Sequence, residues 1–423
     1  MDLKGGEMRR IVFLVVVAAA TSACTSAGSA PATDMVEDSA GITIVHNRGP
    51  LWNDAEAWSL SAGSQVTIGM LDGSAEYQFH DVVAAARQSD GDLVVIDGGT
   101  REVRLYDGLG TFLTKFGGRG SGPGEFQNPV QVLVLPGDTL LVWDDALARV
   151  TRFDPVGNLV DMRTVDRGTV AKAVEPPLYP GTGRLLPDGD LLVRLTEKSG
   201  VKQVRKSGKQ GSSDESRARS GALRVSADYA QVDTLMFFGD AEQVTVSAPW
   251  GDWRIAPPRA KTTVMAVQGS ESRICIGDQK AAEISCFGPD ASRTSIRWIP
   301  QEVAVSEADV TRWRDTTVAM LAGKLSESEV LSVLDQVTVP AVRPPFSAIL
   351  LDAAGNLWVE QGPSSNGDPE STDYLVFDPA GALLGTVVLP QVQVLDIGDD
   401  YIIGVYEDDL EVEYLQLFEI VKP

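Results

Sequence analysis

Histidine is almost absent from this sequence, and so are the short motifs that commonly mark an active site. The 423 residues include two histidines, His46 and His80, which are too few for a three-histidine zinc site. The chain also lacks the Gly-x-Ser-x-Gly elbow of many hydrolases and the lysine-containing glycine loop that holds nucleotide phosphates. These absences exclude several enzyme classes, and we predict no cofactor.

Positive charge is also scarce. The sequence has 36 Lys and Arg against 59 Asp and Glu, which gives a formal net charge of −23. Because nucleic acids and anionic membrane surfaces attract positively charged proteins, neither is an expected direct partner. One segment, residues 196–222, departs from this balance because it is rich in Lys and Arg and poor in large apolar residues. We interpret it as a disordered surface loop, and a contact site for an acidic partner is the alternative.

Long apolar runs are missing except near the N-terminus. Arg9 and Arg10 precede an apolar run over residues 11–20, which is too short to span a bilayer and has the layout of a secretory signal. The run ends in "TSAC", and these four residues resemble the bacterial lipobox. The resemblance implies that residues 1–23 are a lipoprotein signal peptide and that Cys24 is lipidated. An ordinary signal peptide with an incidental cysteine is the alternative.

Lipidation of Cys24 would anchor the mature protein to the cell envelope without a membrane-spanning helix. Thr25 stands where some Gram-negative bacteria use Asp as an inner-membrane retention signal, so the outer membrane is the favoured location, facing the periplasm or the surface. Residues 24–40 are mostly small and polar, which is typical of a flexible tether. We therefore expect the protein to contact the membrane through its lipid.

The two cysteines that follow Cys24 lie in a predicted hairpin. Apolar and polar residues alternate on both sides of residues 277–282. Pairing the two strands about this turn places Cys275 opposite Cys286, at a separation that a disulfide can span. An oxidising compartment favours the bond, and two free buried thiols are the alternative.

Two sequence elements recur along the chain and indicate repeated β-meanders. The first is a turn followed by an apolar strand, as in "SDGDLVVID" and "LPGDTLLVWD"; the second is an aromatic residue that leads a turn, as in "FDPVG" and "FDPAG". In such turns Asp accepts backbone hydrogen bonds, Pro presets φ, and Gly tolerates a positive φ. Tyr106 and Phe153 are separated by the same interval as Asp97 and Asp144. Meanders repeated at this spacing are typical of β-propeller blades.

A glycine-rich stretch, "FGGRGSGPGEFQNP", joins the first two meanders. It closely resembles the Gly-x-Gly-x-Gly-Pro-Gly-Glu-Phe signature of NHL-repeat proteins, with matches at Gly118, Gly120, Gly122, Pro123, Gly124, Glu125 and Phe126. The resemblance implies a six-bladed β-propeller, a fold also found in lipobox-bearing bacterial proteins. We therefore predict an all-β, six-bladed propeller over residues 41–423, in which these glycines serve the backbone conformation.

Residues 306–337 break the meander pattern. Ser306 with Asp309, and Ser326 with Glu329, have the spacing of capping boxes. We predict two short helices inserted between blades four and five, where they cover a propeller face or a blade edge; a mobile lid is the alternative. Near the N-terminus, either residues 41–47 or residues 57–61 are expected to complete the last blade and close the ring.

No group of residues identifies a catalytic or metal site, so the candidates are four residues of a possible ligand face. His80 and Asp81 lie at the entry to the first inner strand, and Arg119 lies at the tip of the glycine-rich stretch. Arg343 stands between prolines before a later inner strand, where its guanidinium could bind an anion. The repeated carboxylates are explained by turns and strand ends; they are Asp97, Asp107, Asp144, Asp154 and Asp378.

Two functions from different classes remain. The favoured one is a non-catalytic binding or scaffold module on the cell envelope that holds a protein, peptide or glycan. The alternative follows from a resemblance to gluconolactonase-like propellers, which bind a divalent ion with carboxylates and an amide. It is a metal-dependent hydrolase or lyase with its site at the central channel, and several carboxylate or amide groups converging on the axis would favour it.

Overall fold

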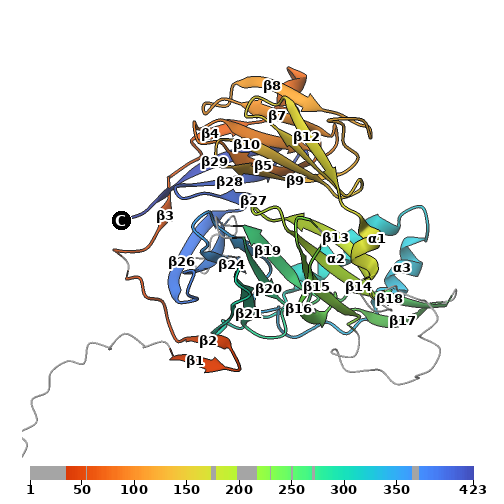
Figure 1. Cartoon of the computed structure of the whole chain (residues 1–423). Coiled ribbons are helices and arrows are strands. Elements are labelled where there is room, and N and C mark those ends of the chain that lie inside the picture. Colours follow the sequence, from red (N-terminus) through yellow and green to blue (C-terminus); the bar gives the residue numbers. More distant parts are fainter. Residues whose placement is uncertain are drawn as a thin grey trace, which may run out of the picture. The chain divides into compact units, whose positions relative to one another are not determined.

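The strands form a six-bladed β-propeller. The computed structural model describes residues 35–53, 55–172, 178–197, 217–228, 230–248, 251–268, 272–363 and 371–423. Within these residues, each of six sheets contains a four-stranded antiparallel meander, and consecutive blades follow one another along the chain (Figure 1). The all-β propeller predicted from the repeats is therefore confirmed. The signal peptide and Cys24 lie outside the described residues.

The first three blades follow the repeats read from the sequence. Blade one contains β5 (Val82–Arg87), β6 (Leu93–Asp97), β7 (Glu102–Tyr106) and β8 (Phe112–Gly117). Blade two contains β9 (Pro129–Leu135), β10 (Thr139–Asp144), β11 (Arg149–Phe153) and β12 (Leu159–Thr164). After α1 (Arg167–Lys172), blade three contains β13 (Leu178–Leu185), β14 (Leu191–Glu197), β15 (Arg219–Val225) and β16 (Val232–Gly239). The loop predicted over residues 196–222 lies mostly outside the described residues. Its first residues belong to β14 and its last residues to β15, so these two ends are strands.

The remaining blades complete the ring. Blade four contains β19 (Val264–Gln268), β20 (Arg273–Gly277), β21 (Glu283–Phe287) and β22 (Arg293–Trp298). Blade five contains β23 (Ile349–Leu351), β24 (Leu357–Pro363), β25 (Ser371–Phe377) and β26 (Leu383–Pro390). Blade six contains β27 (Gln393–Ile397), β28 (Tyr401–Glu407) and β29 (Glu413–Val421), and its fourth strand, β4 (Val66–Ile68), comes from the N-terminal part of the chain.

The turns between outer strands have the conformation that their sequences require. Gly110, Gly157 and Gly381 occupy equivalent turn positions with φ of +85°, +90° and +95°. A side chain at such a φ would be strained, so glycine is needed there. At the start of each of these turns an Asp carboxylate accepts backbone N–H groups, as Asp154 does from the N–H of Asn158 at 2.8 Å. The Asp and Gly of the repeat therefore act together to reverse the chain.

The hydrophobic core is divided among the junctions between blades. Among the described residues, six clusters of buried side chains each contain residues from two neighbouring blades. The strands between them supply alternating apolar residues, such as Val94 and Ile96 toward blade two and Leu93 and Val95 toward blade six. Because each blade is apolar on both faces, it is stabilised by both of its neighbours.

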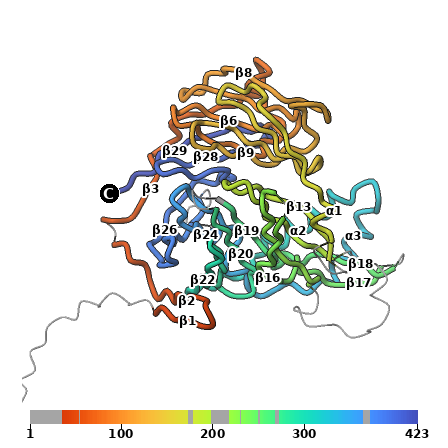
Figure 2. Tube along the Cα trace, viewed as in Figure 1, coloured from red at the N-terminus to blue at the C-terminus, as the bar shows by residue number. Residues whose placement is uncertain are grey.

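Ring closure depends on β4, which lies antiparallel to β29 (Figure 1). Ile68 pairs with Leu415 and Val66 with Leu417. The prediction that residues 41–47 or 57–61 join the last blade is confirmed for the second segment only, and neither segment is the fourth strand of the meander. The first of these segments forms β2 (Ile42–Asn47), which lies parallel to β22 in blade four (Figure 2), and the second contributes β3 (Ser59–Leu60), which pairs with the end of β29 beyond β4.

The chain before the propeller also departs from the predicted tether. Residues 35–39 form β1 (Met35–Ser39), which pairs antiparallel with β2 on the outer side of blade four. The tether predicted for residues 24–40 therefore ends in a strand, and the rest of it lies outside the described residues. A short 3-10 helix, η1 (Ala75–Tyr77), follows β4 before the chain enters blade one. The N-terminal segment thus contacts blades four and six as well as blade one.

The cysteines lie opposite each other in β20 and β21. Cys275 is the register partner of Cys286, and their sulfur atoms are joined in a disulfide with a Cα–Cα distance of 4.1 Å. Both side chains are buried at the junction between blades four and five. The bond therefore crosslinks neighbouring strands inside the core of this junction.

The glycine-rich stretch forms a closed structural loop. Phe126 is fully buried and packs on Phe153, and the carboxylate of Glu125 accepts the N–H of Gly122 at 2.8 Å. A Cβ atom on Gly120 would lie 2.0 Å from that carboxylate, so a larger residue there would displace the Glu125 side chain from its bond to Gly122. The guanidinium of Arg149 donates to the carbonyl oxygens of Ser121, Gly122 and Glu125. The carbonyls and glycines of this loop therefore serve the fold, which is the role of a connector between two blades.

We predict that removing the Ile68 side chain weakens ring closure. Ile68 is 2% exposed in the junction between blades six and one, so Ile68→Ala should lower the free energy of unfolding by about 2 to 5 kcal/mol. The matched control is Thr67→Ala on the same strand, whose side chain is exposed and whose loss should cost no more than about 0.5 kcal/mol. Chemical denaturation of both variants measures the difference, and equal effects would contradict the role of β4.

Candidate binding site

Two helices and a hairpin form an accessory layer outside the six blades. The helices are α2 (Glu307–Leu321) and α3 (Glu327–Leu334), and both N-termini carry the predicted capping boxes, at Ser306 with Asp309 and at Ser326 with Glu329. The hairpin consists of β17 (Val244–Ala248) and β18 (Gly251–Ile255). In the chain, the helices follow β22 of blade four. In space, they pack on this hairpin, which precedes blade four. They are therefore not strictly an insertion between blades four and five, as the sequence predicted.

Apolar contacts hold the accessory layer together. Val333 and Val337, at and beyond the end of α3, are buried against Val246 of β17, and Trp313 of α2 packs on the same cluster. The indole N–H of Trp313 donates to the carbonyl oxygen of Ala256 at 2.9 Å. These contacts hold α2 next to the end of β18.

Asp309 ties the start of α2 to two distant parts of the chain. Its carboxylate accepts the N–H of Ser306 at 3.0 Å, which completes the capping box. It also pairs with the guanidinium of Arg259 at 2.7 Å and with that of Arg343 at 2.8 Å. The Asp309 side chain is only 4% exposed, so the two arginines compensate a charge that burial would otherwise disfavour.

These interactions determine the pKa of Asp309. Burial of the carboxyl acts to raise its pKa, but the Ser306 N–H and the guanidiniums of Arg259 and Arg343 outweigh burial and lower the pKa to about 2. The carboxylate is therefore ionised at any physiological pH. Because two guanidiniums share this one carboxylate, the three side chains together carry a net positive charge.

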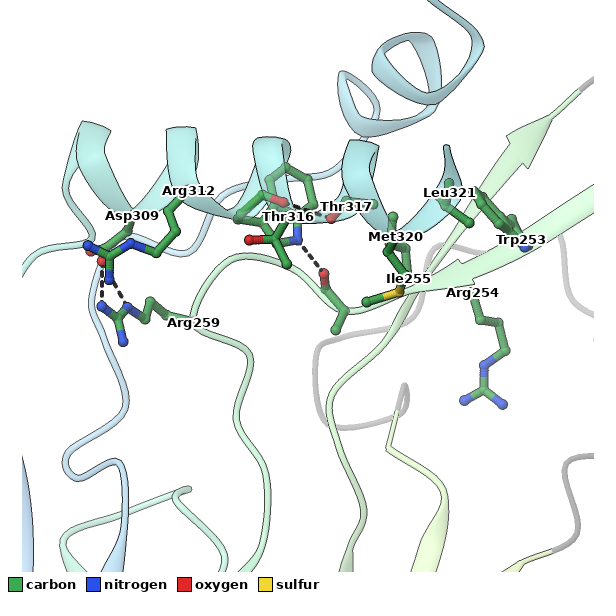
Figure 3. A pocket seen from close by; sticks show the side chains of 12 residues that line it. Trp253, Arg254, Ile255, Arg259, Asp309, Arg312, Thr316, Thr317, Met320 and Leu321 are labelled. Atoms are coloured by element: carbon green, nitrogen blue, oxygen red, sulfur yellow. Dashed lines mark hydrogen bonds and ion pairs between the residues drawn. The ribbon is translucent and has the colours of Figure 1, made fainter. Parts of the chain in front are cut away.

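A pocket of about 540 Å³ lies between β18 and α2 (Figure 3). This volume is in the range of small-molecule binding sites. Residues of both elements and of the segment after β18 line it: Trp253, Arg254, Ile255, Ala256, Arg259, Asp309, Arg312, Trp313, Thr316, Thr317, Met320 and Leu321. We call it the α2 pocket.

The α2 pocket has two chemically different ends. Arg259 and Asp309 form an ion pair at one end, and Arg312 extends from α2 toward the same end (Figure 3). Met320, Leu321 and Trp253 lie at the other end (Figure 3). Arg254 points away from α2 (Figure 3), so the positive charge is concentrated at the Asp309 end. The arrangement can bind a molecule that carries an anionic group on an apolar body.

The structure does not bring the four sequence-predicted ligand residues together. His80 and Asp81 are exposed in the loop before β5, where the backbone N–H of His80 donates to Asp97 and that of Asp81 donates to Glu413. Arg119 is exposed in the glycine-rich loop, next to the backbone of Phe126. No interaction shown among the described residues links these three side chains into one site.

Arg343 binds a carboxylate of the chain itself through one edge of its guanidinium. The sequence suggested a guanidinium that binds an external anion, but both Nε and Nη2 of Arg343 contact the carboxylate of Asp309, at 2.9 and 2.8 Å. Its anion is therefore part of the chain itself. The sequence did not indicate this partner, because Asp309 lies on a helix whose position relative to Arg343 no local pattern reveals.

The repeated aspartates serve the fold, as their sequence positions indicate. Asp97 is completely buried, pairs with Arg104 at 3.0 Å and accepts the N–H of Thr100. Asp144, at the equivalent position of blade two, is also buried and accepts the N–H groups of Gln127 and Leu147. The pKa of Asp107 is lowered mainly by the backbone N–H of Thr111. These carboxylates are already engaged within the chain.

Two further observations bear on the site. Among the described residues, no group of three or more His, Cys, Asp and Glu side chains is placed to hold a metal ion. In the same part of the chain, no helix combines the length and the hydropathy that crossing a membrane requires.

Comparison with known proteins does not identify a family. Neither a family model nor a curated protein matches the sequence. A Bacteroides fragilis protein described as exported has a similar structure, with 14% identity, a TM-score of 0.44, and coverage of 90% of this chain and 100% of that chain. A member of the DUF4221 family from Bacteroides vulgatus has 9% identity, a TM-score of 0.48, and coverage of 88% and 100%. A gluconolactonase from Xanthomonas campestris has 12% identity, a TM-score of 0.36, and coverage of 80% and 88%. At these identities and TM-scores, the similarities carry no argument about this chain.

The α2 pocket was missed by sequence reasoning, although part of its signal is visible. The alternation in "VTVSAPWGDWRI", residues 244–255, is that of a β-hairpin, and helical spacing places Trp313 and Leu321 on one face of the first helix. The sequence pattern does not show that the hairpin and the helix contact each other, because the whole of blade four separates them in the chain. Arg259 and Arg312 have no sequence signature as a pair.

We predict that Asp309→Asn destabilises the accessory layer in a pH-dependent way. The pKa of Asp309 is about 2 in the folded protein, below its ordinary value of 3.8, so its contribution is complete above pH 4 and is lost as the pH falls toward 2. The shift corresponds to about 2 kcal/mol at neutral pH. Urea unfolding at pH 6 should therefore show a lower free energy of unfolding for the variant than for wild type. At pH 2.5 this difference in free energy should be smaller. Asp315→Asn, at an exposed position on α2, is the control for general charge effects. If the difference in free energy between wild type and Asp309→Asn is the same at both pH values, the ion pairs of Asp309 do not explain it.

Proposed function

We propose that this chain is an exported β-propeller lipoprotein, anchored to the cell envelope through Cys24, that acts as a binding module and holds its ligand in the α2 pocket. The observation that carries the binding role is the pocket itself, which combines a volume of about 540 Å³ with an apolar end and a cationic end. An apolar pocket with a few convergent polar groups is the usual form of a small-ligand site.

Support for export comes from two independent features. Residues 9–20 have the layout of a secretory signal and are followed by the small residues and cysteine of a lipobox. The disulfide between Cys275 and Cys286 is the kind of bond that persists in an oxidising compartment, outside the cytoplasm. Outer-membrane placement follows from Thr25 and is part of the proposal.

The sequence suggested a protein, peptide or glycan as the partner, and we propose that this partner binds through the α2 pocket. The bound group must be small enough to fit between β18 and α2, so a large partner would insert only one side chain, terminus or attached group. Among the described residues, no group of three or more His, Cys, Asp and Glu side chains is placed to hold the metal ion of the alternative hydrolase or lyase.

The anchor is tested by Cys24→Ser in the native host. Wild type should appear in the membrane fraction, with an N-terminal peptide whose mass includes the lipid, because several acyl chains together bind a bilayer durably. Cys24→Ser should move to the soluble envelope fraction or remain uncleaved. An unmodified Cys24 in the wild-type protein would remove the anchor from the proposal.

The pocket is tested by photo-crosslinking in the native envelope. A photoreactive amino acid at Met320, which lines the pocket with its side chain 70% exposed, should form a discrete adduct that intact-mass measurement detects. The same amino acid at Thr311, which is exposed on α2 but does not line the pocket, is the matched control. Adding Thr316→Trp, which places a large side chain in the pocket, should abolish the Met320 adduct. Equal labelling from both positions, or no adduct from Met320, would contradict the proposed site.

A further inference from the structure

We propose that the α2 pocket takes an acyl carboxylate, a single apolar chain that ends in a carboxylate, as in a free fatty acid. This inference rests on the proposed binding function, since it assigns a ligand class to the same pocket. It departs from the protein, peptide and glycan classes that the sequence suggested.

The cationic end of the pocket fits a carboxylate. Asp309 occupies the Nε and Nη2 edge of Arg259, at 2.8 and 2.7 Å, which leaves the other guanidinium edge for a second anion. Arg312 is exposed, and no ion pair joins it to another described residue. Two guanidiniums can together hold a planar carboxylate through charge-assisted hydrogen bonds.

The charge balance at this end favours binding of an anion over binding of a cation. Asp309 is the one acidic residue among those that line the pocket, and it lies between Arg259 and Arg343. Arg259, Arg312 and Arg343 therefore bring three positive charges to this end against a single carboxylate (Figure 3), in a chain whose formal net charge is −23. A local positive charge in so acidic a protein selects for a ligand with a negative group.

The other end of the pocket fits an apolar chain. Trp253, Met320 and Leu321 lie there, and Met320 remains 70% exposed although it is a large apolar residue. An exposed apolar surface beside a pocket is typical of a binding site, because covering it removes apolar area from water. The flexible thioether side chain of Met adapts to an unbranched chain without a fixed shape.

The separation of the two ends argues against a peptide or a glycan in the same place. Peptide amides and sugar hydroxyls are distributed along the whole molecule, and each one that leaves water needs a hydrogen-bond partner. Between the two ends lie Thr316 and Thr317, and the Thr317 hydroxyl already donates to the carbonyl oxygen of Trp313 at 2.7 Å. An acyl chain has no such requirement, since its one polar group is at its end.

Calorimetric titration with dodecanoate, below its micelle concentration, tests the ligand class. The protein is the mature chain with Cys24→Ser, which needs no detergent. Dodecanoate should bind at one site, and dodecanol and dodecylammonium should bind at least about tenfold more weakly because they lack the anion. From hexanoate upward, affinity should rise by about fourfold per methylene until the chain fills the pocket. Equal affinity for dodecanoate and dodecanol would overturn the proposal.

Two variants on one helix test the position of the carboxylate. Arg312→Gln should weaken dodecanoate binding at least about tenfold and leave dodecanol binding unchanged. Arg314→Gln is the control, because Arg314 lies outside the pocket and pairs with Asp335 of the α3 end at 2.8 Å. Circular dichroism shows that each variant is folded. Equal binding by Arg312→Gln and Arg314→Gln would also overturn the proposal.

The outcomes separate this inference from the proposed function. If apolar peptides with a free C-terminal carboxylate bind more tightly than dodecanoate, or if the Met320 crosslink yields a peptide or glycan adduct, the binding module stands and the acyl ligand is wrong. If dodecanoate does not bind and Met320 also forms no adduct, both proposals fail.

Discussion

Closure of the ring is the constraint on which the rest of the structure depends. The first and last blades meet because β4, from the N-terminal part of the chain, supplies the fourth strand beside β29 at the C-terminus. Ile68 and Leu415 then share one buried cluster with residues of blade one. The carboxylate of Glu413 accepts the N–H groups of Asp81 and Val82 and links blade six to blade one directly. Without β4, the outer side of blade six would expose an unpaired edge, and apolar faces at this junction would meet water.

The accessory layer uses this rigid ring as a support. Its helices and hairpin pack mainly on each other, and Asp309 holds them to the chain on both sides of blade four through Arg259 and Arg343. A fold of this kind hosts many unrelated functions, so function must be argued from the site and not from the blades. The α2 pocket lies in the part of the structure that the propeller repeat does not explain.

Local patterns predicted the repeated parts well because their causes are local. The Asp and Gly of each turn, the alternation of the strands and the capping boxes at Ser306 and Ser326 act over a few residues, so the sequence shows them directly. The pairing of Cys275 with Cys286 also belongs to one hairpin. Distant contacts were predicted less well. Of the two N-terminal segments expected in the last blade, β3 pairs with β29 but β2 joins blade four, and the ion pair between Arg343 and Asp309 was not predicted.

The sequence by itself determined the class of fold, the blade repeat, the structural role of the glycine-rich loop and the positions of both helices. Tertiary structure alone decided which strand closes the ring, which hairpin the helices cover and which guanidiniums meet at the α2 pocket. The physical reason is that several short strands here have similar propensity and similar edges to pair with, and burial in the assembled core selects among them. Charge at the pocket arises in the same way, since Arg259 and Arg312 come together only when β18 and α2 pack.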